Sequence, residues 1–142
     1  MKLVVDNSVA MRWLFADGSK ADRQYANEVA ALVETSEVHM PALFVIEAAN
    51  VISRALKTGV ITAQESQSRF DLLNAMQANI DPIESTHSTM SLAIQAFELG
   101  LSAYDASYLR LAQKLGCPLA TLDKDLRRTA KNCGVEIAGV GA

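Results

Sequence analysis

The stretch Lys2-Leu-Val-Val-Asp-Asn-Ser8 decides how this chain folds. Its three consecutive apolar residues, two of them β-branched, predict a short buried strand that ends at Asp6. In an open α/β sheet, ligands bind outside the carboxyl ends of the strands, which is where Asp6 would lie. An aspartate at this point commonly caps the following helix, but Ser8 precedes the helical run and is an equally good cap. Asp6 is therefore free for another role if further acids reach the same edge.

Length and composition predict one domain over residues 1–142. A hydrophobic content of 50% is enough for a core and excludes a disordered chain. Every apolar run is too short to span a bilayer, and strand residues occupy the place of a signal peptide, so we expect a cytoplasmic protein. Cys117 and Cys133 lie apart without a CxxC motif or a neighbouring histidine, so we expect reduced core residues, not a zinc site or a redox pair.

The net charge does not decide whether the chain acts on nucleic acid. A formal charge of −3 argues against a large basic patch. If four carboxylates bind metal ions, however, the remaining charges sum to +1, and the bound cations make the site more positive still. A metal-dependent nuclease is therefore compatible with this charge.

Strand and helix patterns alternate along the chain. Strands are predicted at 3–5, 38–40, 80–83, 118–122 and 135–137, and helices at 9–15, 20–34, 43–56, 62–76, 88–99, 102–115 and 124–132. Strands separated by helical crossovers form mostly parallel sheets with helices on both faces. The sequence therefore predicts an α/β fold with three α/β/α layers.

Four acids occupy positions that this pattern does not require: Asp6, Glu47, Asp105 and Asp123. Glu47 is the only charge in the run Leu43–Ile52, where an unpaired carboxylate would be costly. Asp105 and Asp123 begin helices, and each alone is explained as an acid favoured by the helix dipole. Because parallel strands end at one edge, Asp6 and Asp123 come together if their strands are neighbours, and Asp105 opens the helix leading into the second strand.

Such a cluster of acids predicts a divalent metal site. Four carboxylates at one edge repel one another unless protons or cations compensate them, and an all-oxygen set suits Mg²⁺ or Mn²⁺ better than zinc. His39 and His87 have no second His or Cys at ligand spacing, so we expect both at the surface or a strand edge. Carboxylate-bound hard cations commonly serve phosphoryl chemistry without a protein nucleophile. The sequence accordingly has no GxSxG elbow, GxxxxGK[ST] loop or GxGxxG turn.

Four segments, in this order, resemble the PIN-domain ribonucleases of the VapC toxin type: LVVDNSVAMRWLF (3–15), PALFVIEAANVI (41–52), LSAYDASYLRLAQKLG (101–116) and PLATLDKDL (118–126). Each motif is short, but together they span nearly the whole chain. The resemblance implies a PIN-like fold and an acidic metal site of Asp6, Glu47, Asp105 and Asp123, with Ser8 and Thr121 as supporting hydroxyls. It also implies an RNA substrate, a homodimer and a cognate antitoxin, as in type II toxin–antitoxin systems.

Basic residues supply candidates for RNA contact. Lys124, Arg127 and Arg128 follow Asp123 and are placed to hold phosphates, although a solvated helix face explains them equally simply. Arg12 stands beside a tryptophan where the family commonly has lysine, which retains the charge.

Several alternatives stay open from the sequence alone. Trp13-Leu14-Phe15 forms either a groove for a partner helix or ordinary core, and Asp125 is either an outer acid of the site or a helix-start acid. Aspartate-based phosphohydrolases and phospho-acceptor signalling domains also place aspartates after parallel strands. They need a lysine after a late strand, which this chain lacks, and Asp6 has no second acid two residues on. A non-catalytic protein-binding module is the third class.

Overall fold

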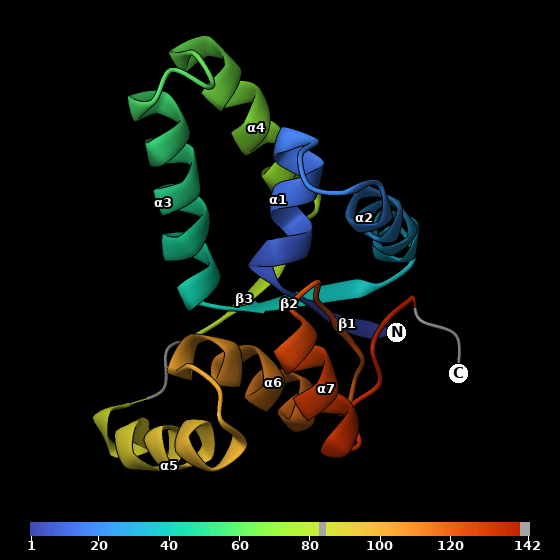
Figure 1. The fold of residues 1–142 in the computed structure, drawn as a ribbon, viewed down its shortest axis with the longest axis vertical. Helices are drawn as coiled ribbons and strands as arrows, with labels where there is room; N and C mark the ends of the chain where they lie inside the picture. The colour runs from blue at the N-terminus through green and yellow to red at the C-terminus, as the bar shows by residue number, and fades with distance from the viewer. Residues whose placement is uncertain (83–84, 140–142) are drawn as a thin grey trace.

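The computed structural model describes residues 1–82 and 85–139, which form three layers around a parallel sheet (Figure 1). Strands β1 (Lys2–Val5), β2 (Glu37–Pro41), β3 (Asn79–Asp81) and β4 (Leu119–Ala120) lie in the order β3-β2-β1-β4. Each neighbouring pair is parallel. The predicted α/β/α architecture is therefore confirmed. The end of the strand expected at 80–83 falls on Ile83, outside the described residues.

Helices cover both faces of this sheet (Figure 1). On one face lie α1 (Asn7–Phe15), α2 (Lys20–Val33), α3 (Leu43–Lys57) and α4 (Ala63–Ala75). On the other lie α5 (Thr89–Leu99), α6 (Ala103–Leu115) and α7 (Lys124–Asn132), with a 3-10 turn, η1 (Thr86–Ser88), before α5. No helix in the described part of the chain is long and apolar enough to cross a membrane.

Capping residues set the ends of several helices. Thr62 Oγ1 accepts from the Glu65 N–H (3.1 Å) and Glu65 Oε1 from the Thr62 N–H (3.0 Å), which is the capping box that the spacing predicts. Gly100, at φ 67°, ends α5 in a left-handed conformation that other residues rarely adopt. Ser102 Oγ then accepts from the Asp105 N–H (3.1 Å) and begins α6. This turn places Asp105 in the first turn of α6.

Strand β1 lies at the centre of the core. Leu3, Val4 and Val5 are each 0% exposed, because helices cover both faces of the sheet, with α6 packed against this strand on one of them. Burial on both faces explains why this strand is a continuous apolar run without alternation. Because β1 is packed tightly in the core, the position of Asp6, which directly follows this strand, is fixed.

Two strands are shorter than the sequence pattern predicts. β4 covers Leu119–Ala120 and not 118–122, and 135–137 contributes one isolated parallel bridge to β4. After β4 the Leu122 N–H donates to Ser8 Oγ (3.0 Å) and not to a strand carbonyl. Apolar residues in both segments are buried by packing, so hydrophobic pattern alone overstates the extent of the hydrogen-bonded ladder.

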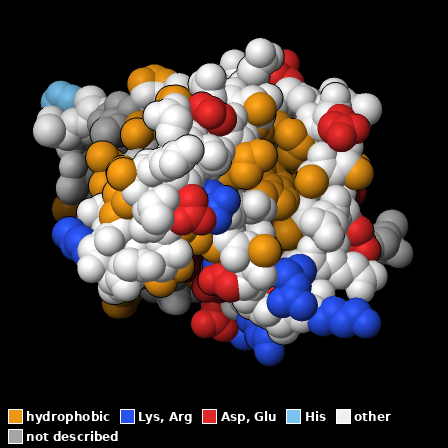
Figure 2. All heavy atoms as spheres, turned by 90° about the horizontal axis from the view of Figure 1, so that it is seen from above, with side chains coloured by type: hydrophobic (Ala, Val, Ile, Leu, Met, Phe, Trp, Pro, Cys, Tyr) orange, Lys and Arg blue, Asp and Glu red, His pale blue; other side chains and the backbone are white. Residues whose placement is uncertain are grey.

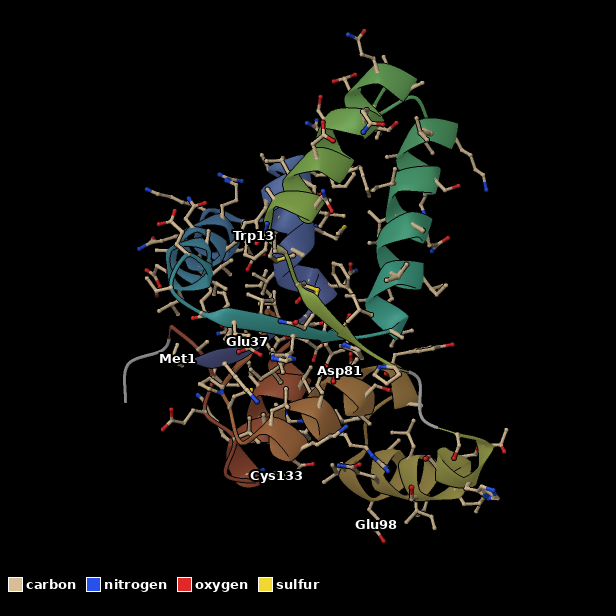
Figure 3. All side chains as sticks on the ribbon, turned by 180° about the vertical axis from the view of Figure 1, so that it is seen from behind. Met1, Trp13, Glu37, Asp81, Glu98 and Cys133 are labelled. Carbon is tan, nitrogen blue, oxygen red and sulfur yellow. The ribbon has the colours of Figure 1, made fainter. Side chains whose placement is uncertain are left out.

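The histidine and cysteine predictions need correction. His39 is buried (8% exposed), with Nε2 2.7 Å from Glu37 Oε1 and Nδ1 3.3 Å from Asp81 Oδ2; Figure 3 labels both acids. The parallel register of β2 and β3 creates this contact, which a sequence pattern does not reveal. Cys117 and Cys133 are free thiols, as expected, but they are only partly buried and pack against the core instead of lying fully within it.

Candidate functional site

The acidic site lies where the order of the sheet reverses. From β1 the chain continues to β2 on one side, whereas β4, formed much later, pairs with β1 on the other. Val5 pairs with Ala120, so Asp6 and the segment that carries Asp123 leave the sheet side by side. Such a reversal opens a crevice at the carboxyl ends of the strands, and ligands bind there in open α/β sheets.

Asp6 is held by two hydroxyl groups. Its Oδ2 accepts from Ser8 Oγ (2.8 Å) and from Thr121 Oγ1 (2.7 Å), and only 5% of the residue is exposed. Burial raises the pKa of Asp6 because it penalises the charged form, although both hydroxyls act to lower it. The expectation that Ser8 caps the helix is wrong. α1 begins at Asn7 with Asp6 in the N-cap position, and the Asp6 side chain makes no capping bond.

Asp123 caps a helix and also lies at the same edge of the sheet as Asp6. Its Oδ1 accepts from the Leu126 N–H (2.8 Å), so it caps α7 as its position suggested. Its own N–H donates to Thr121 Oγ1 (3.1 Å). Thr121 thus contacts Asp6 and Asp123 through a single hydroxyl group, and it is completely buried.

Glu47 reaches the edge from α3 and is held by a tyrosine. The Tyr108 hydroxyl donates to Glu47 Oε1 (2.6 Å), and Tyr108 is completely buried. Burial raises the pKa of Glu47, the Tyr108 hydrogen bond lowers it, and the charge of Asp6 raises it. Tyr108 was missed in the sequence analysis. It follows Asp105 by three residues on α6, and this helical spacing places both on one face, which is a signal that could have found it.

Asp105 interacts electrostatically with the three other acids. Its pKa is raised from 3.8 to about 6, first by burial and then by the charges of Asp123, Asp6 and Glu47. All three other carboxylates are therefore close enough to disfavour its ionised form. The structure brings together, at one edge of the sheet, the four acids that the sequence analysis identified. We call this edge, with Asp6, Glu47, Asp105 and Asp123, the acidic edge.

The chemistry of the donors suits a hard divalent cation, but the side chains are not already arranged around one. Within residues 1–82 and 85–139, no three His, Cys, Asp or Glu side chains form a group that could hold a metal ion as placed. Asp6, Glu47 and Asp123 each make a hydrogen bond inside the protein. All of these groups present carboxylate oxygens, with hydroxyls behind them, and this is the ligand chemistry of Mg²⁺ and Mn²⁺. The side chains would have to rearrange for these acids to bind one cation.

Two of the basic candidates form surface ion pairs. Arg12 Nη2 lies 3.0 Å from Asp17 Oδ1, just beyond the end of α1. Arg128 Nη2 lies 3.0 Å from Asp125 Oδ1 on α7, and both side chains are well exposed. Asp125 therefore acts within its own helix as a helix-start acid, the second of its two interpretations.

The aromatic segment at the end of α1 is packed within the protein. Trp13 Nε1 donates to the Ala26 carbonyl in α2 (2.7 Å), and Leu14 is a core residue that is 3% exposed. Phe15 lies under the Arg69 guanidinium of α4, 5.8 Å from the ring centroid. Of the two interpretations left open, core packing explains these side chains.

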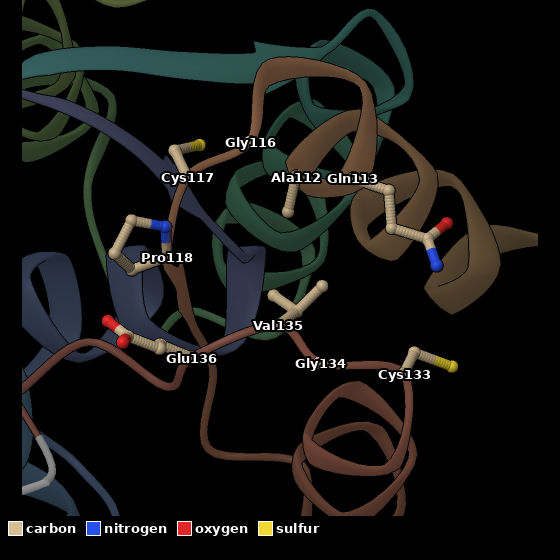
Figure 4. A pocket seen from close by; sticks show the side chains of 9 residues that line it. All are labelled: Ala112, Gln113, Gly116, Cys117, Pro118, Cys133, Gly134, Val135 and Glu136. Carbon is tan, nitrogen blue, oxygen red and sulfur yellow. The ribbon is translucent and has the colours of Figure 1, made fainter.

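A pocket elsewhere in the molecule is distinct from the acidic edge. About 530 Å³ in volume, it is lined by residues 112–113, 116–118 and 133–136 (Figure 4). Residues 116–118 precede β4, so the pocket lies at the amino-terminal end of that strand, whereas Asp123 follows its carboxyl end. Its only acid is Glu136, together with the thiols of Cys117 and Cys133. The pocket shares no residue with the acidic site.

Comparison with protein families agrees with this geometry. A family model described as "PIN domain" matches residues 3–132, a span that includes all four acids. The chain belongs to the PIN-domain family. The PIN domain accounts for nearly the whole protein, as the sequence motifs suggested.

Individual relatives extend this result. The PIN domain described here is 29% identical over 130 residues to Ribonuclease VapC3 of Pyrobaculum aerophilum, covering 89% of this chain and 92% of the relative. Its fold is similar to the crystal structure of PAE2754 from the same organism, with a TM-score of 0.68, 19% identity and coverage of 96% and 83% of the two chains. VapBC2 from Rickettsia felis, bound to a promoter DNA fragment, matches with a TM-score of 0.62, 17% identity and coverage of 90% and 92%.

Proposed function

We propose that this PIN-domain protein is an endoribonuclease that hydrolyses RNA phosphodiester bonds with Mg²⁺, or Mn²⁺, at the acidic edge of its sheet. The observation that carries the proposal is the environment of Asp105, whose pKa of about 6 reflects burial and three neighbouring carboxylates. Such crowding of acids is stable at neutral pH when cations compensate it. A relative named a ribonuclease, matched over most of both chains, supports the same activity.

Each residue of the site has a role in this proposal. Asp6, Glu47, Asp105 and Asp123 hold the cation, and the hydroxyls of Ser8 and Thr121 keep Asp6 in place. Bound there, a divalent cation would polarise a phosphoryl oxygen and lower the pKa of an attacking water. Tyr108 fixes the orientation of Glu47, so the chain supplies aligned carboxylates and no nucleophilic side chain.

The start of α7 is the proposed contact for RNA phosphates. Lys124 directly follows Asp123 and is exposed, and Arg128 lies one turn further along the same helix. Their positive charges would bind the phosphate groups that flank the cleaved bond. Arg12 lies on α1, paired with Asp17, and would reach RNA only by exchanging that partner.

Metal dependence is the direct test of this function. Purified protein should cleave single-stranded or structured RNA in Mg²⁺ or Mn²⁺, and excess EDTA should abolish cleavage until the metal is restored. The reason is that four uncompensated carboxylates would repel a phosphate group. Undiminished cleavage in excess chelator would contradict the metal mechanism, and intact RNA in the presence of either metal would contradict the ribonuclease assignment.

We also propose that the protein is a toxin restrained by a cognate antitoxin and that it forms a homodimer. Apolar side chains reach the surface on several helices, including Ile46 on α3 (66% exposed) and Phe97 on α5 (86% exposed), and Figure 2 shows such patches on one face. Exposed apolar surface of this kind is typical of protein interfaces.

A dimer is the expected state in solution. Light scattering at micromolar concentration should give about twice the chain mass of 15.3 kDa, because association buries apolar side chains that a monomer leaves in water. A monomer mass under these conditions would contradict the prediction.

A further inference from the structure

Arg127 differs from its neighbours on α7 because its side chain is used inside the protein. Its Nε donates to the backbone carbonyl of Thr121 (2.6 Å). The same guanidinium group lies 4.3 Å from the centroid of the Tyr25 ring, a cation–π distance. Arg128, by contrast, is exposed and pairs with an acid of its own helix. The Arg127 guanidinium is thus held at its Nε edge by the Thr121 carbonyl and on one planar face by the Tyr25 ring.

Tyr25 is itself a fixed part of the structure. It belongs to α2, is buried, and donates its hydroxyl to the Ala138 carbonyl (2.7 Å) near the end of the described chain. Figure 1 shows α2 and α7 in different layers, so the contact between Tyr25 and Arg127 joins the two layers beyond β4. Arg127 therefore rests against a rigid surface and not against a mobile side chain.

Thr121 connects this contact to the acidic edge. Its carbonyl accepts from Arg127, while its hydroxyl donates to Asp6 Oδ2 (2.7 Å) and accepts from the Asp123 N–H (3.1 Å). β4 ends at Ala120, so the strand ladder does not hold this residue. The orientation of the Thr121 peptide determines where its hydroxyl points. Arg127 holds that peptide through its carbonyl, whereas the two acids contact the residue through its hydroxyl group.

We propose that Arg127 is a positioning residue for the acidic site, acting through Thr121 to align Asp6 with Asp123. The contacts of Arg127 with Thr121 and Tyr25 support this positioning role, and its effect on catalysis rests on the proposed ribonuclease function. Lysine reproduces this arrangement poorly. Its compact ammonium group can donate to a carbonyl, but it has no planar face that lies against Tyr25 while an N–H along its edge meets the Thr121 carbonyl. A phosphate-binding role would tolerate that exchange, since lysine keeps the charge.

The first test measures amide hydrogen exchange in metal-free protein. Arg127→Ala and Arg127→Lys should both speed exchange at residues 122–123 by at least about tenfold, because a lost hydrogen bond to a charged group leaves their Ser8 and Thr121 contacts unsupported. Arg23→Ala is the matched control. It removes the same charge from an exposed position on α2, where the Arg23 guanidinium donates to the Gly18 carbonyl in the loop before the helix (2.6 Å), and should leave these amides unchanged.

The reference amides decide whether the effect is local. Val4 and Val5 lie in β1, the buried centre of the sheet, and report any general loss of stability. The proposal is overturned if exchange at 122–123 is unchanged in Arg127→Ala, or if it rises no more than exchange at Val4 and Val5. This result does not depend on nuclease activity, so it stands even if the wild type cleaves no RNA and the proposed function fails.

The second test separates positioning from RNA binding by kinetics. In an active wild type, both Arg127 variants should lower kcat at least about tenfold, with KM for RNA unchanged within about twofold, because misaligned carboxylates slow the chemical step. A raised KM that lysine restores would show phosphate contact and overturn the proposal, as would full kcat in Arg127→Ala. Arg23→Ala should match the wild type in both constants.

Discussion

Asp105→Asn should remove RNA cleavage while keeping or raising the stability of the metal-free protein. Asp105 is the acid whose pKa responds to all three other carboxylates, so neutralising it relieves the most crowded position of the site. It also removes a proposed metal ligand. A helix cap would behave in the opposite way, since losing a cap typically costs about 1 kcal/mol and leaves the chemistry intact.

The unfolding free energy of the metal-free protein should depend on pH through the ionisation of Asp105. The folded-state pKa of about 6 lies above the ordinary value of 3.8, so the folded protein binds the proton more tightly than the unfolded chain. The unfolding free energy of the metal-free wild type should therefore fall as pH rises from about 4 to about 6. Because Asp105 is only half-buried, we expect the Asp105→Asn substitution to add no more than about 1 kcal/mol at pH 7, with the difference vanishing below about pH 4.

Urea unfolding in EDTA between pH 4 and pH 8, run beside an RNA cleavage assay, measures both effects. Thr62→Ala is the matched control, because it removes a genuine cap of α4, remote in sequence from the acids, and should lower stability while cleavage continues. If Asp105→Asn instead behaved like this control, the carboxylate would be a helix-terminal acid and no part of the site.

Asp6→Asn should remove cleavage and most of the stabilisation that Mg²⁺ gives. The asparagine carbonyl can still accept from Ser8 and Thr121, so the local geometry is retained while the negative charge is lost. Burial already disfavours the charged form of Asp6, so the metal-free stability should be maintained or raised. In the wild type, Mg²⁺ at 100 times its Kd would add about 2.7 kcal/mol by mass action.

Thermal melts with and without Mg²⁺ test this prediction directly. Asp71→Asn is the charge-matched control: Asp71 lies exposed on α4, accepts from Gln67 in the same helix, and is not placed in the site. This control should keep both the Mg²⁺ shift and cleavage. A shift in Asp6→Asn as large as that of the wild type would show that Asp6 does not bind the metal.

The sequence predicted the acidic edge because the relevant signals are local. A short apolar run followed by an acid identifies a buried strand and the end at which the acid emerges, and Asp6 directly follows β1 as this rule predicts. Asp123 comes three residues after the end of β4, but its segment still leaves the sheet beside Asp6. Only the pairing of β1 with β4 had to be assumed, and the structure confirms it. Topology rules for parallel sheets leave few other arrangements.

The contacts that orient the acids could not be predicted from local sequence patterns. Arg127 appeared as one of several basic residues on a helix, and only its tertiary contacts with Tyr25 and Thr121 show that its guanidinium is engaged. His39 was placed at the surface or a strand edge, yet it is buried where β2 and β3 align two acids beside it. Both sets of contacts were missed because side-chain partners from distant segments are set by tertiary structure.

The four acids are anchored on different elements, and the last of them lies at position 123 of 142 residues. A ribosome must therefore synthesise the whole segment from Asp6 to Asp123 before the four acids can come together. The Thr121 carbonyl meets Arg127 later still, and Tyr25 meets Ala138 close to the end. If the proposed ribonuclease function holds, the site stays incomplete on a nascent chain until the segment from Asp6 to Asp123 has left the ribosome.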